Sequence, residues 1–101
     1  MSALKFDPVI HAPNRLQICA LLAPLEEAEF QVLRDELGVS DSVLSKHVSR
    51  LVEAGYVRLR KSAVNGRQHT WASLTIRGRK AFAAHLEALS ELAGLTGNAS
   101  N

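Results

Sequence analysis

The chain has 101 residues, 47% of them hydrophobic, which suits one small domain with a single core and leaves no room for a separate ligand-binding domain. One cysteine excludes an internal disulfide framework, and nowhere do about 18 apolar residues run together as in a membrane-spanning helix. The formal net charge of +2 hides an asymmetry, since residues 1–54 hold five basic and eight acidic side chains whereas residues 55–101 hold seven and two. Because the first 15 residues also lack the apolar core of a signal peptide, we expect a cytoplasmic protein with no membrane partner.

A first helix is predicted from Pro13 to just before Pro24. Proline suits the first position of a helix, where its missing N–H would have no partner. The apolar side chains spread round most of the circumference of this helix, which indicates burial between other elements. They are Leu16, Ile18, Cys19, Leu21 and Leu22. A connector follows at residues 25–29, and we expect two of its residues to form a short third strand against the hairpin described below.

Residues 30–54 have the pattern of a helix-turn-helix. A short helix from Phe30 to Leu37 ends at Gly38, and the next helix begins after Ser40, which can cap its first turn. Gly55 ends this second helix at the position where a left-handed residue is favoured.

The second helix of this unit has two chemically different faces. One face is an apolar stripe at helical spacing, formed by Leu44, Val48, Leu51 and Val52. The opposite face carries short polar side chains and one cation, namely Ser42, Ser45, Lys46 and Ser49. A helix that is merely solvated usually carries Glu and Lys in pairs four residues apart, whereas small hydroxyl side chains allow close approach to another surface. We therefore predict that this is a recognition helix.

A β-hairpin is predicted directly after the recognition helix. Its strands, at about residues 56–63 and 68–74, flank the pair Asn65-Gly66, which favours a tight turn. A hairpin that directly follows a recognition helix is called a wing. Between Arg58 and Lys80 the chain has seven basic residues and no acidic one, the charge pattern expected for phosphate binding. The alternative is that these cations only protect the exposed edges of the hairpin.

A last helix is predicted at about residues 76–93, capped by Thr75, and residues 94–101 are predicted to be a disordered tail. This helix and the N-terminal segment carry more apolar surface than one small domain can cover, so we expect a homodimer interface there. The predicted interface residues are Leu4, Phe6, Val9, Ile10, Phe82, Leu86, Leu89, Leu92 and Ala93. The alternative is that the N-terminal segment folds back onto the last helix of its own subunit, and both arrangements hold if the segments cross between subunits.

The run from about Phe30 to Phe82 resembles the small bacterial and archaeal winged-helix transcriptional regulators related to the MarR and ArsR groups. The matching pieces are Leu-Gly-Val-Ser at residues 37–40, Leu-Ser-Lys-His-Val at 44–48, Ala-Gly-Tyr-Val at 54–57, Asn-Gly-Arg at 65–67 and Leu-Thr-Ile-Arg-Gly-Arg at 74–79. The resemblance implies a single α+β, mainly α domain at residues 1–93, a winged helix-turn-helix with a two- to three-stranded β-wing and a C-terminal dimerisation helix. It also implies a dimeric DNA-binding regulator, and we favour a repressor that binds an inverted-repeat operator.

Double-stranded DNA is the expected partner, with the recognition helix in the major groove and the wing on the backbone or in the minor groove. The residues expected to contact DNA from the helix are Ser40, Ser42, Val43, Ser45, Lys46, His47, Ser49 and Arg50, and those from the wing are Arg60, Lys61, Asn65, Arg67, Gln68 and His69. Two of them have an alternative. His47 could pack at the flank of the helix near Ala54, and Val43 could be partly buried against the preceding helix instead of meeting a thymine methyl group.

The residues indicate neither catalysis nor a metal or other cofactor. Ser45 and His47 lie two residues apart on a helix and point in different directions, and no orienting acid is evident. No short metal-ligand spacing links Cys19 with the histidines, which are His11, His47, His69 and His85. A small-molecule effector could bind between the first helix and the dimer seam, but no polar side chains converge there to identify one.

A winged helix used for protein–protein assembly is the main alternative function, because a fold does not fix a function. Such a module would tend to present exposed aromatic or aliphatic anchors on its recognition face, and this chain presents serines and a lysine. RNA is a weaker alternative, because exposed aromatic side chains for base stacking are missing.

Overall fold

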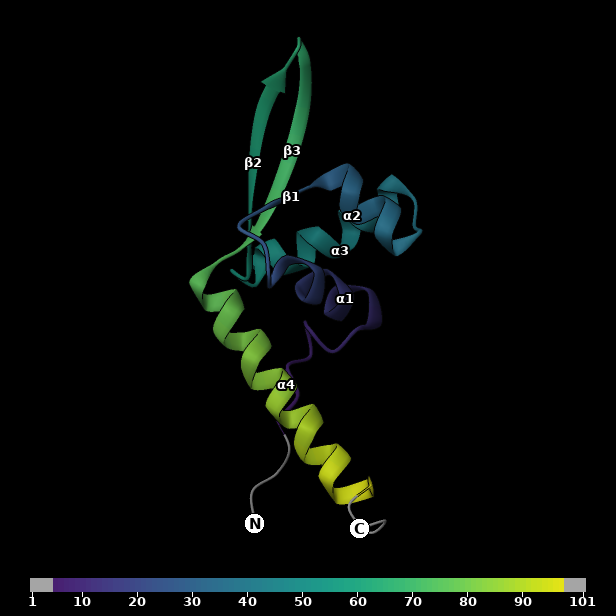
Figure 1. Cartoon of the computed structure of the whole chain (residues 1–101), viewed down its shortest axis with the longest axis vertical. Helices are drawn as coiled ribbons and strands as arrows, with labels where there is room; N and C mark the ends of the chain where they lie inside the picture. Colours follow the sequence, from purple (N-terminus) through teal and green to yellow (C-terminus); the bar gives the residue numbers. More distant parts are fainter. Residues whose placement is uncertain (1–4, 98–101) are drawn as a thin grey trace.

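A computed structural model describes residues 5–97 as a helical body from which a β-hairpin and a long last helix project (Figure 1). The elements are α1 (Pro13–Leu22), β1 (Ala28–Glu29), α2 (Phe30–Leu37), α3 (Asp41–Glu53), β2 (Val57–Val64), β3 (Arg67–Leu74) and α4 (Ile76–Gly97). The hairpin of β2 and β3 extends from one end of the body and α4 from the other, so that the molecule is 57 Å long but only 25 and 22 Å across. The predicted fold, a mainly helical winged helix-turn-helix, is confirmed.

Helix α1 lies at the centre of the body and contacts α2, α3 and β3. It starts with Pro13 in its first turn and buries Ile18, Cys19 and Leu22 completely, which confirms its predicted burial between other elements. Burial raises the pKa of the Cys19 thiol to about 11, so this group stays protonated at neutral pH. The core joins apolar side chains from the N-terminal segment, the helices and the base of the sheet: Ile10, Ile18, Cys19, Leu22, Ala28, Leu33, Leu44, Val48, Leu51, Val57, Ala72, Leu74 and Phe82.

The three strands form one antiparallel sheet in the order β1-β3-β2. Ala28 of β1 pairs with Ala72 of β3, which confirms the predicted short third strand. At the far end of the hairpin, Asn65 and Gly66 have φ angles of 52° and 76°. Two consecutive positive φ values are the backbone of a type I′ turn, whose twist matches that of the flanking strands, and this is why Asn-Gly stands here.

The end of α3 and the start of α4 are joined through Gly55, Tyr56, Thr75 and Gly78. Gly55 is left-handed, with a φ of 82°, and turns the chain from α3 into β2. The Thr75 hydroxyl donates to the Gly55 carbonyl at 2.6 Å and accepts from the Gly78 N–H at 2.9 Å, so it caps α4 as predicted. A Cβ atom on Gly78 would overlap the Tyr56 carbonyl oxygen and lie 2.9 Å from the carbonyl carbon. The first turn of α4 therefore rests directly on backbone.

Helix α4 continues to Gly97, so the predicted helix boundary at residue 93 is wrong. Gly94 lowers helix propensity by only about 1 kcal/mol relative to alanine, and no proline follows to end the helix. Residues 98–101 of the predicted tail lie outside the described residues.

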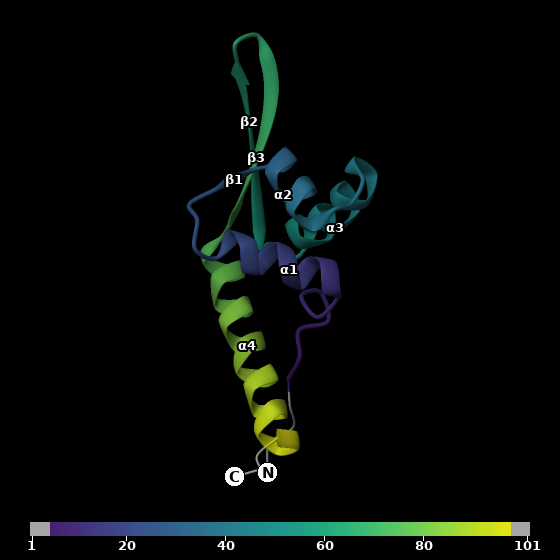
Figure 2. The ribbon, with the colours of Figure 1, turned by 45° about the vertical axis from the view of Figure 1, so that its right-hand side comes forward.

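The N-terminal segment, residues 5–12, packs against α4 of the same chain (Figure 2). Ile10 is completely buried in the core, and the Asp7 N–H donates to the imidazole of His85 on α4. Of the residues predicted for a dimer interface, Ile10 and Phe82 belong to the core of one chain instead of an exposed seam. Leu4 lies outside the described residues.

Replacing Gly78 by alanine should destabilise the protein by about 1–3 kcal/mol or more, because the new Cβ must displace the Tyr56 backbone. Urea unfolding of both proteins measures the change. Gly94→Ala is the matched control, since a Cβ at Gly94 meets nothing within 4 Å and alanine is the better helix former, so stability should rise by up to about 1 kcal/mol. Equal stabilities for the two variants would contradict the close contact.

Candidate nucleic-acid interface

Helix α3 separates its side chains into a buried and an exposed face, as the sequence predicts. Leu44, Val48 and Leu51 are at most 2% exposed. Val52, predicted for the same buried stripe, is 38% exposed because it lies at the edge of the stripe, so that part of the prediction is wrong. The residues predicted to read DNA lie on the other side and are exposed: Ser42, Val43, Ser45, Lys46, Ser49 and Arg50. Val43 is 38% exposed, so its side chain is available at the surface near the start of the helix.

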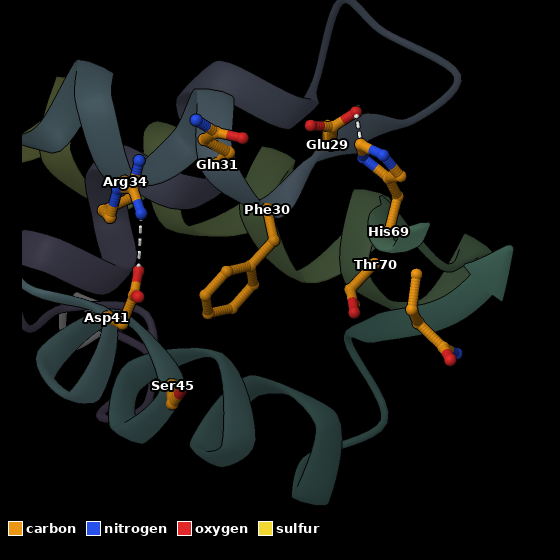
Figure 3. Close-up of a pocket in the computed structure, with 9 residues that line it drawn as sticks. Glu29, Phe30, Gln31, Arg34, Asp41, Ser45, His69 and Thr70 are labelled. Carbon is orange, nitrogen blue, oxygen red and sulfur yellow. Dashed lines mark hydrogen bonds and ion pairs between the residues drawn. The ribbon is translucent and has the colours of Figure 1, made fainter. Parts of the chain in front are cut away.

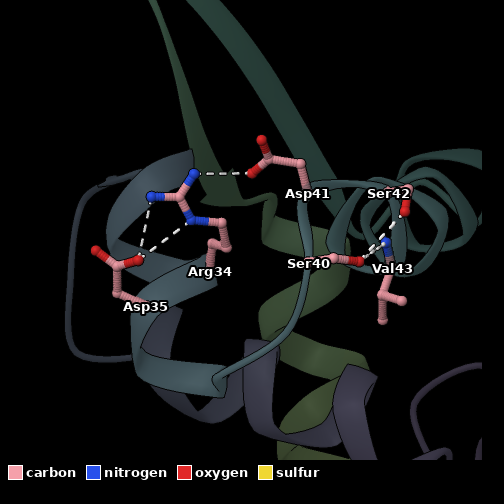
Figure 4. A network of polar contacts seen from close by, with 6 residues as sticks. All are labelled: Arg34, Asp35, Ser40, Asp41, Ser42 and Val43. Carbon is pink, nitrogen blue, oxygen red and sulfur yellow. Dashed lines mark hydrogen bonds and ion pairs between the residues drawn. The ribbon is translucent and has the colours of Figure 1, made fainter.

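The first turn of α3 is held by a hydrogen bond that the Ser40 hydroxyl oxygen accepts (Figure 4). Its oxygen accepts from the Val43 N–H at 3.2 Å, which is the N-cap bond, and lies 3.2 Å from the hydroxyl oxygen of Ser42. Ser40 is also one of the residues predicted to contact DNA, and its hydroxyl already takes part in holding the helix. Ser40 is thus a structural residue as well as a candidate contact.

An ion-pair network fixes α2 against α3 across the turn of the helix-turn-helix. The Arg34 guanidinium on α2 lies 3.0 Å from the Asp41 carboxylate at the start of α3 and 3.2 Å from that of Asp35 (Figure 4). The hydrogen bond to Asp41, with that to Asp35 second, raises the pKa of Arg34. The pair also offsets the negative charge of Asp41, which would otherwise repel a phosphate close to the recognition helix.

An open groove of about 380 Å³ separates α3 from the wing (Figure 3). Phe30 of α2 extends into it, Ser45 lines it from α3, and Gln68 and Thr70 line it from β3. The reading face of the helix and the inner face of the wing therefore border one concave surface.

The pairing register shows which wing side chains share a face. Leu59 pairs with Ala72 and Arg60 with Trp71, and successive residues of a strand point to opposite faces. Ala72 is fully buried in the core, so Arg60 and Trp71 lie on the outer face of the wing. By the same alternation Lys61 and Gln68 lie on the inner face.

Two predicted wing contacts are engaged by acidic residues of the β1 region. The Arg60 guanidinium donates two hydrogen bonds to the Glu27 carboxylate, at 3.1 and 2.5 Å, and its Cζ lies 5.3 Å from the centroid of the Trp71 ring. The His69 imidazole lies 3.1 Å from the Glu29 carboxylate. Arg60 lowers the pKa of Glu27, first through the hydrogen bond, so that this carboxylate is held charged. Both side chains therefore have a partner within the chain that competes with DNA.

Local sequence patterns do not identify Glu27 and Glu29 as part of this surface. One signal exists, since two residues of the connector at 25–29 are predicted to pair with the hairpin and this connector contains three acidic side chains. The missing information was the register, which places Glu29 opposite Trp71 and next to His69.

His47 lies at the flank of α3 against α1, away from the reading face. Its ring nitrogens lie 3.3 Å from the Asn14 amide and 3.2 Å from the Arg15 guanidinium. Burial and the charges of Arg15 and Lys46 lower the pKa of His47, so the ring is neutral at pH 7. The flank alternative is therefore the one the structure has, although the neighbours belong to α1 and not to the region of Ala54.

The wing tip projects beyond the helical body and carries exposed polar residues. Asn65 and Gly66 form the turn, and Arg67 and Gln68 follow it on β3 with both side chains exposed. The tip can therefore reach a surface that lies against the recognition helix.

In residues 5–97 no helix has both the length and the apolar character needed to cross a bilayer. The described side chains also bring together no group of three or more histidine, cysteine or acidic residues with a geometry suited to a metal ion.

A capped recognition helix beside a projecting, basic wing defines a winged-helix DNA-binding protein. A family model described as "Winged helix DNA-binding domain" matches residues 14–93, and the chain belongs to this family. It is a DNA-binding protein of the transcriptional-regulator type, and the expected resemblance to such regulators is confirmed.

Individual proteins support the same assignment. The chain is 37% identical over 84 residues to "Uncharacterized protein MJ0432" of Methanocaldococcus jannaschii, a match that covers 83% of this chain and 91% of the relative. A transcriptional regulator homologue of Pyrococcus horikoshii OT3 superposes with a TM-score of 0.79 at 26% identity, covering 87% of this chain and 88% of that one. MarR superposes with a TM-score of 0.74 at 15% identity over 86% of this chain and 63% of its own, which shows a shared fold.

Ser40→Ala should cost about 1 kcal/mol of stability, because it removes the acceptor that caps α3. Thermal or urea unfolding measures the loss. Ser49→Ala makes the same chemical change at an exposed position inside the helix, where alanine is the better helix former, so it should leave stability unchanged or slightly higher. If both variants lose the same amount, the cap is not what the Ser40 hydroxyl contributes.

Proposed function

We propose that the protein is a sequence-specific transcriptional regulator that binds double-stranded DNA as a homodimer. Helix α3 enters the major groove, and the wing tip at residues 65–69 follows the backbone or enters the adjacent minor groove. The observation that carries the proposal is the exposed face of α3, where Ser42, Ser45 and Lys46 lie beside the groove bordered by the wing. Small side chains let the helix approach the base edges, and Lys46 can donate to guanine O6 and N7.

The contacts divide between the two elements. Ser42, Val43, Ser45 and Lys46 face base edges and set sequence preference, while Ser49 and Arg50 lie further along the exposed side of the helix. From the wing, Lys61, Asn65, Arg67 and Gln68 supply phosphate and groove contacts. Arg60 and His69 already contact Glu27 and Glu29, so they contribute less.

The dimer forms through α4. Leu86 and Leu92 are 46% and 39% exposed on a helix that projects from the body, with Leu89 half-buried between them. Pairing two copies about a two-fold axis covers this apolar surface and places two recognition helices on the same DNA. The operator is then an inverted repeat with half-sites about 34–36 Å apart, or a multiple of that distance.

We infer repression as the sign of regulation. The described surface offers a DNA-reading face and a self-association face, and a dimer of this kind acts by occupying its operator. The decisive experiment is the selection of bound sequences from random duplex DNA by the purified protein. An enriched inverted repeat supports the proposal, whereas no enrichment at low salt would point to a protein–protein assembly module instead.

Substitutions in the wing and in the helix should have different effects on DNA binding. Arg67→Ala should weaken binding to all sequences alike and reduce the slope of log K against log salt by about one for each phosphate that the side chain neutralises, hence about two in a symmetric dimer. Lys46→Ala should instead change the preferred base, at a cost of roughly 1–3 kcal/mol in discrimination. Salt titrations on operator and random DNA separate the two. An unchanged slope for Arg67→Ala with a uniform loss for Lys46→Ala would reverse the assigned roles.

Leu86→Glu should convert a dimer into monomers, because it places a charge in the apolar surface of α4. Sedimentation of both proteins at micromolar concentration measures the change. Ala84→Glu controls for the added charge, because this exposed position lies on the side of the helix roughly opposite Leu86. A monomeric unmodified protein would refute the proposed dimer.

A further inference from the structure

One buried polar side chain has no part in the DNA interface. His85 of α4 is only 1% exposed and faces the N-terminal segment. Its ring centroid lies 5.1 Å from that of His11 and 5.6 Å from that of Phe6. Two imidazoles and a phenyl ring thus attach the N-terminal segment to the last helix.

The hydrogen bonds define which nitrogen of each ring carries a proton. The Asp7 N–H donates to His85 Nδ1 at 3.1 Å, and an amide can only donate, so Nδ1 is unprotonated. Neutral His85 therefore has its proton on Nε2, which lies 3.2 Å from His11 Nδ1. His11 Nδ1 must then be the acceptor. The hydrogen bonds thus run in one direction, since Asp7 donates to His85 and His85 donates to His11.

This relay, the two hydrogen bonds that link Asp7, His85 and His11, cannot take up a proton without losing one of its hydrogen bonds. A proton added to His85 would sit on Nδ1 and face the Asp7 N–H, and a proton added to His11 Nδ1 would face the Nε2–H of His85. Either event leaves two donors pointing at each other. This is costly at His85, whose side chain is only 1% exposed, whereas His11 is exposed to water. Burial, followed by the charge of His11, lowers the pKa of His85, and the Asp7 carboxylate only partly offsets this.

The other titratable groups around His85 keep one charge state between pH 5 and 8. Burial alone would raise the pKa of Asp7, but hydrogen bonds from Tyr56, Ile10 and Val9 outweigh it and lower the pKa. The Tyr56 hydroxyl donates to the Asp7 carboxylate, and this hydrogen bond raises the pKa of Tyr56. The charge of Arg77 lowers the pKa of Tyr56, but by less. On α1, the Cys19 thiol has a pKa of about 11. The titration of this site in that range is therefore assigned to His85.

We propose that His85 and His11 form a proton-sensitive joint, which holds the N-terminal segment on α4 at neutral pH and releases it on acidification. The Asp7 side chain also binds Tyr56, the second residue after the C-cap of α3. Opening the joint therefore frees α4 from one of its links to the recognition helix. This property belongs to the single chain and does not depend on DNA binding.

The sign of the effect follows from the lowered pKa. The folded-state pKa of His85 lies below the ordinary value of about 6.5, which applies to the unfolded chain. Its contribution to stability is complete above about pH 6.5 and is lost as the pH falls from there to the folded-state pKa. Within that interval, each unit by which the pH falls should raise the unfolding equilibrium constant by up to tenfold for this one proton.

Nuclear magnetic resonance of the full, unmodified chain tests the joint directly. At pH 8 the ring nitrogens of His85 should show the Nε2–H tautomer, and hydrogen exchange at the Asp7 amide should accelerate, beyond the intrinsic pH effect, as His85 titrates. An Nδ1–H tautomer, or an Asp7 amide whose protection is unchanged through the titration, overturns the proposal. Because no substitution is needed, this test does not depend on a variant that folds.

Urea unfolding between pH 8 and 5 provides a second test. His85→Asn keeps an acceptor near the position of Nδ1 but does not titrate, so it should lose the part of the pH dependence that belongs to His85. His47→Gln is the matched control, because it removes another histidine of lowered pKa without touching the relay and should retain that part. Equal pH dependence in the unmodified chain and in His85→Asn overturns the joint.

Discussion

The contact of Gly78 with the backbone of Tyr56 determines how the two ends of this molecule are related. Tyr56 directly follows the recognition helix and its turn, and Gly78 lies in the first turn of α4, so a missing Cβ allows the two elements to meet. The Thr75 hydroxyl strengthens the same joint by bonding both Gly55 and Gly78. The direction in which α4 leaves the body, and with it the axis of the proposed dimer, is set at this point. Half-site spacing on DNA would depend on it as well.

Charge in the wing is less available than its composition suggests. The wing region has no acidic residue of its own, yet β1 brings Glu27 to Arg60 and Glu29 to His69. Arg79, at the start of α4, donates to the carbonyls of Ala23 and Leu25 and so serves the loop after α1. Arg58, Lys61 and Arg67 remain exposed along the hairpin, from its base to its tip. Electrostatic attraction to DNA is thereby spread over the length of the hairpin.

The N-terminal segment adds a second link between α4 and the body. Asp7 and His11 precede residue 14, where the match to the winged-helix family begins, so this link combines a residue of the family domain, His85, with a segment outside it. The segment also contributes Ile10 to the core that includes Phe82. Some of the apolar side chains that suggest a dimer are therefore buried within one chain. The interface proposed for α4 rests on Leu86, Leu89 and Leu92.

The sequence by itself determined the elements and the two-faced recognition helix, because these depend on local rules. Proline at the start of α1, glycine after α2 and α3, the Asn65-Gly66 turn and the spacing of Leu44, Val48 and Leu51 act within a few residues, and each was placed correctly. The end of α4 was placed wrongly, since a single glycine is a weak stop signal.

Only the tertiary structure determined which of the predicted DNA-contact residues already bond to other residues of the chain. Arg60 meets Glu27 across 33 residues, His47 meets Asn14 across 33, and His11 meets His85 across 74. Such pairs depend on strand register and on the angle between helices, which no local pattern encodes. Composition counted Arg60 and His69 as DNA contacts, whereas the packing of β1 beside the wing gives both an internal partner.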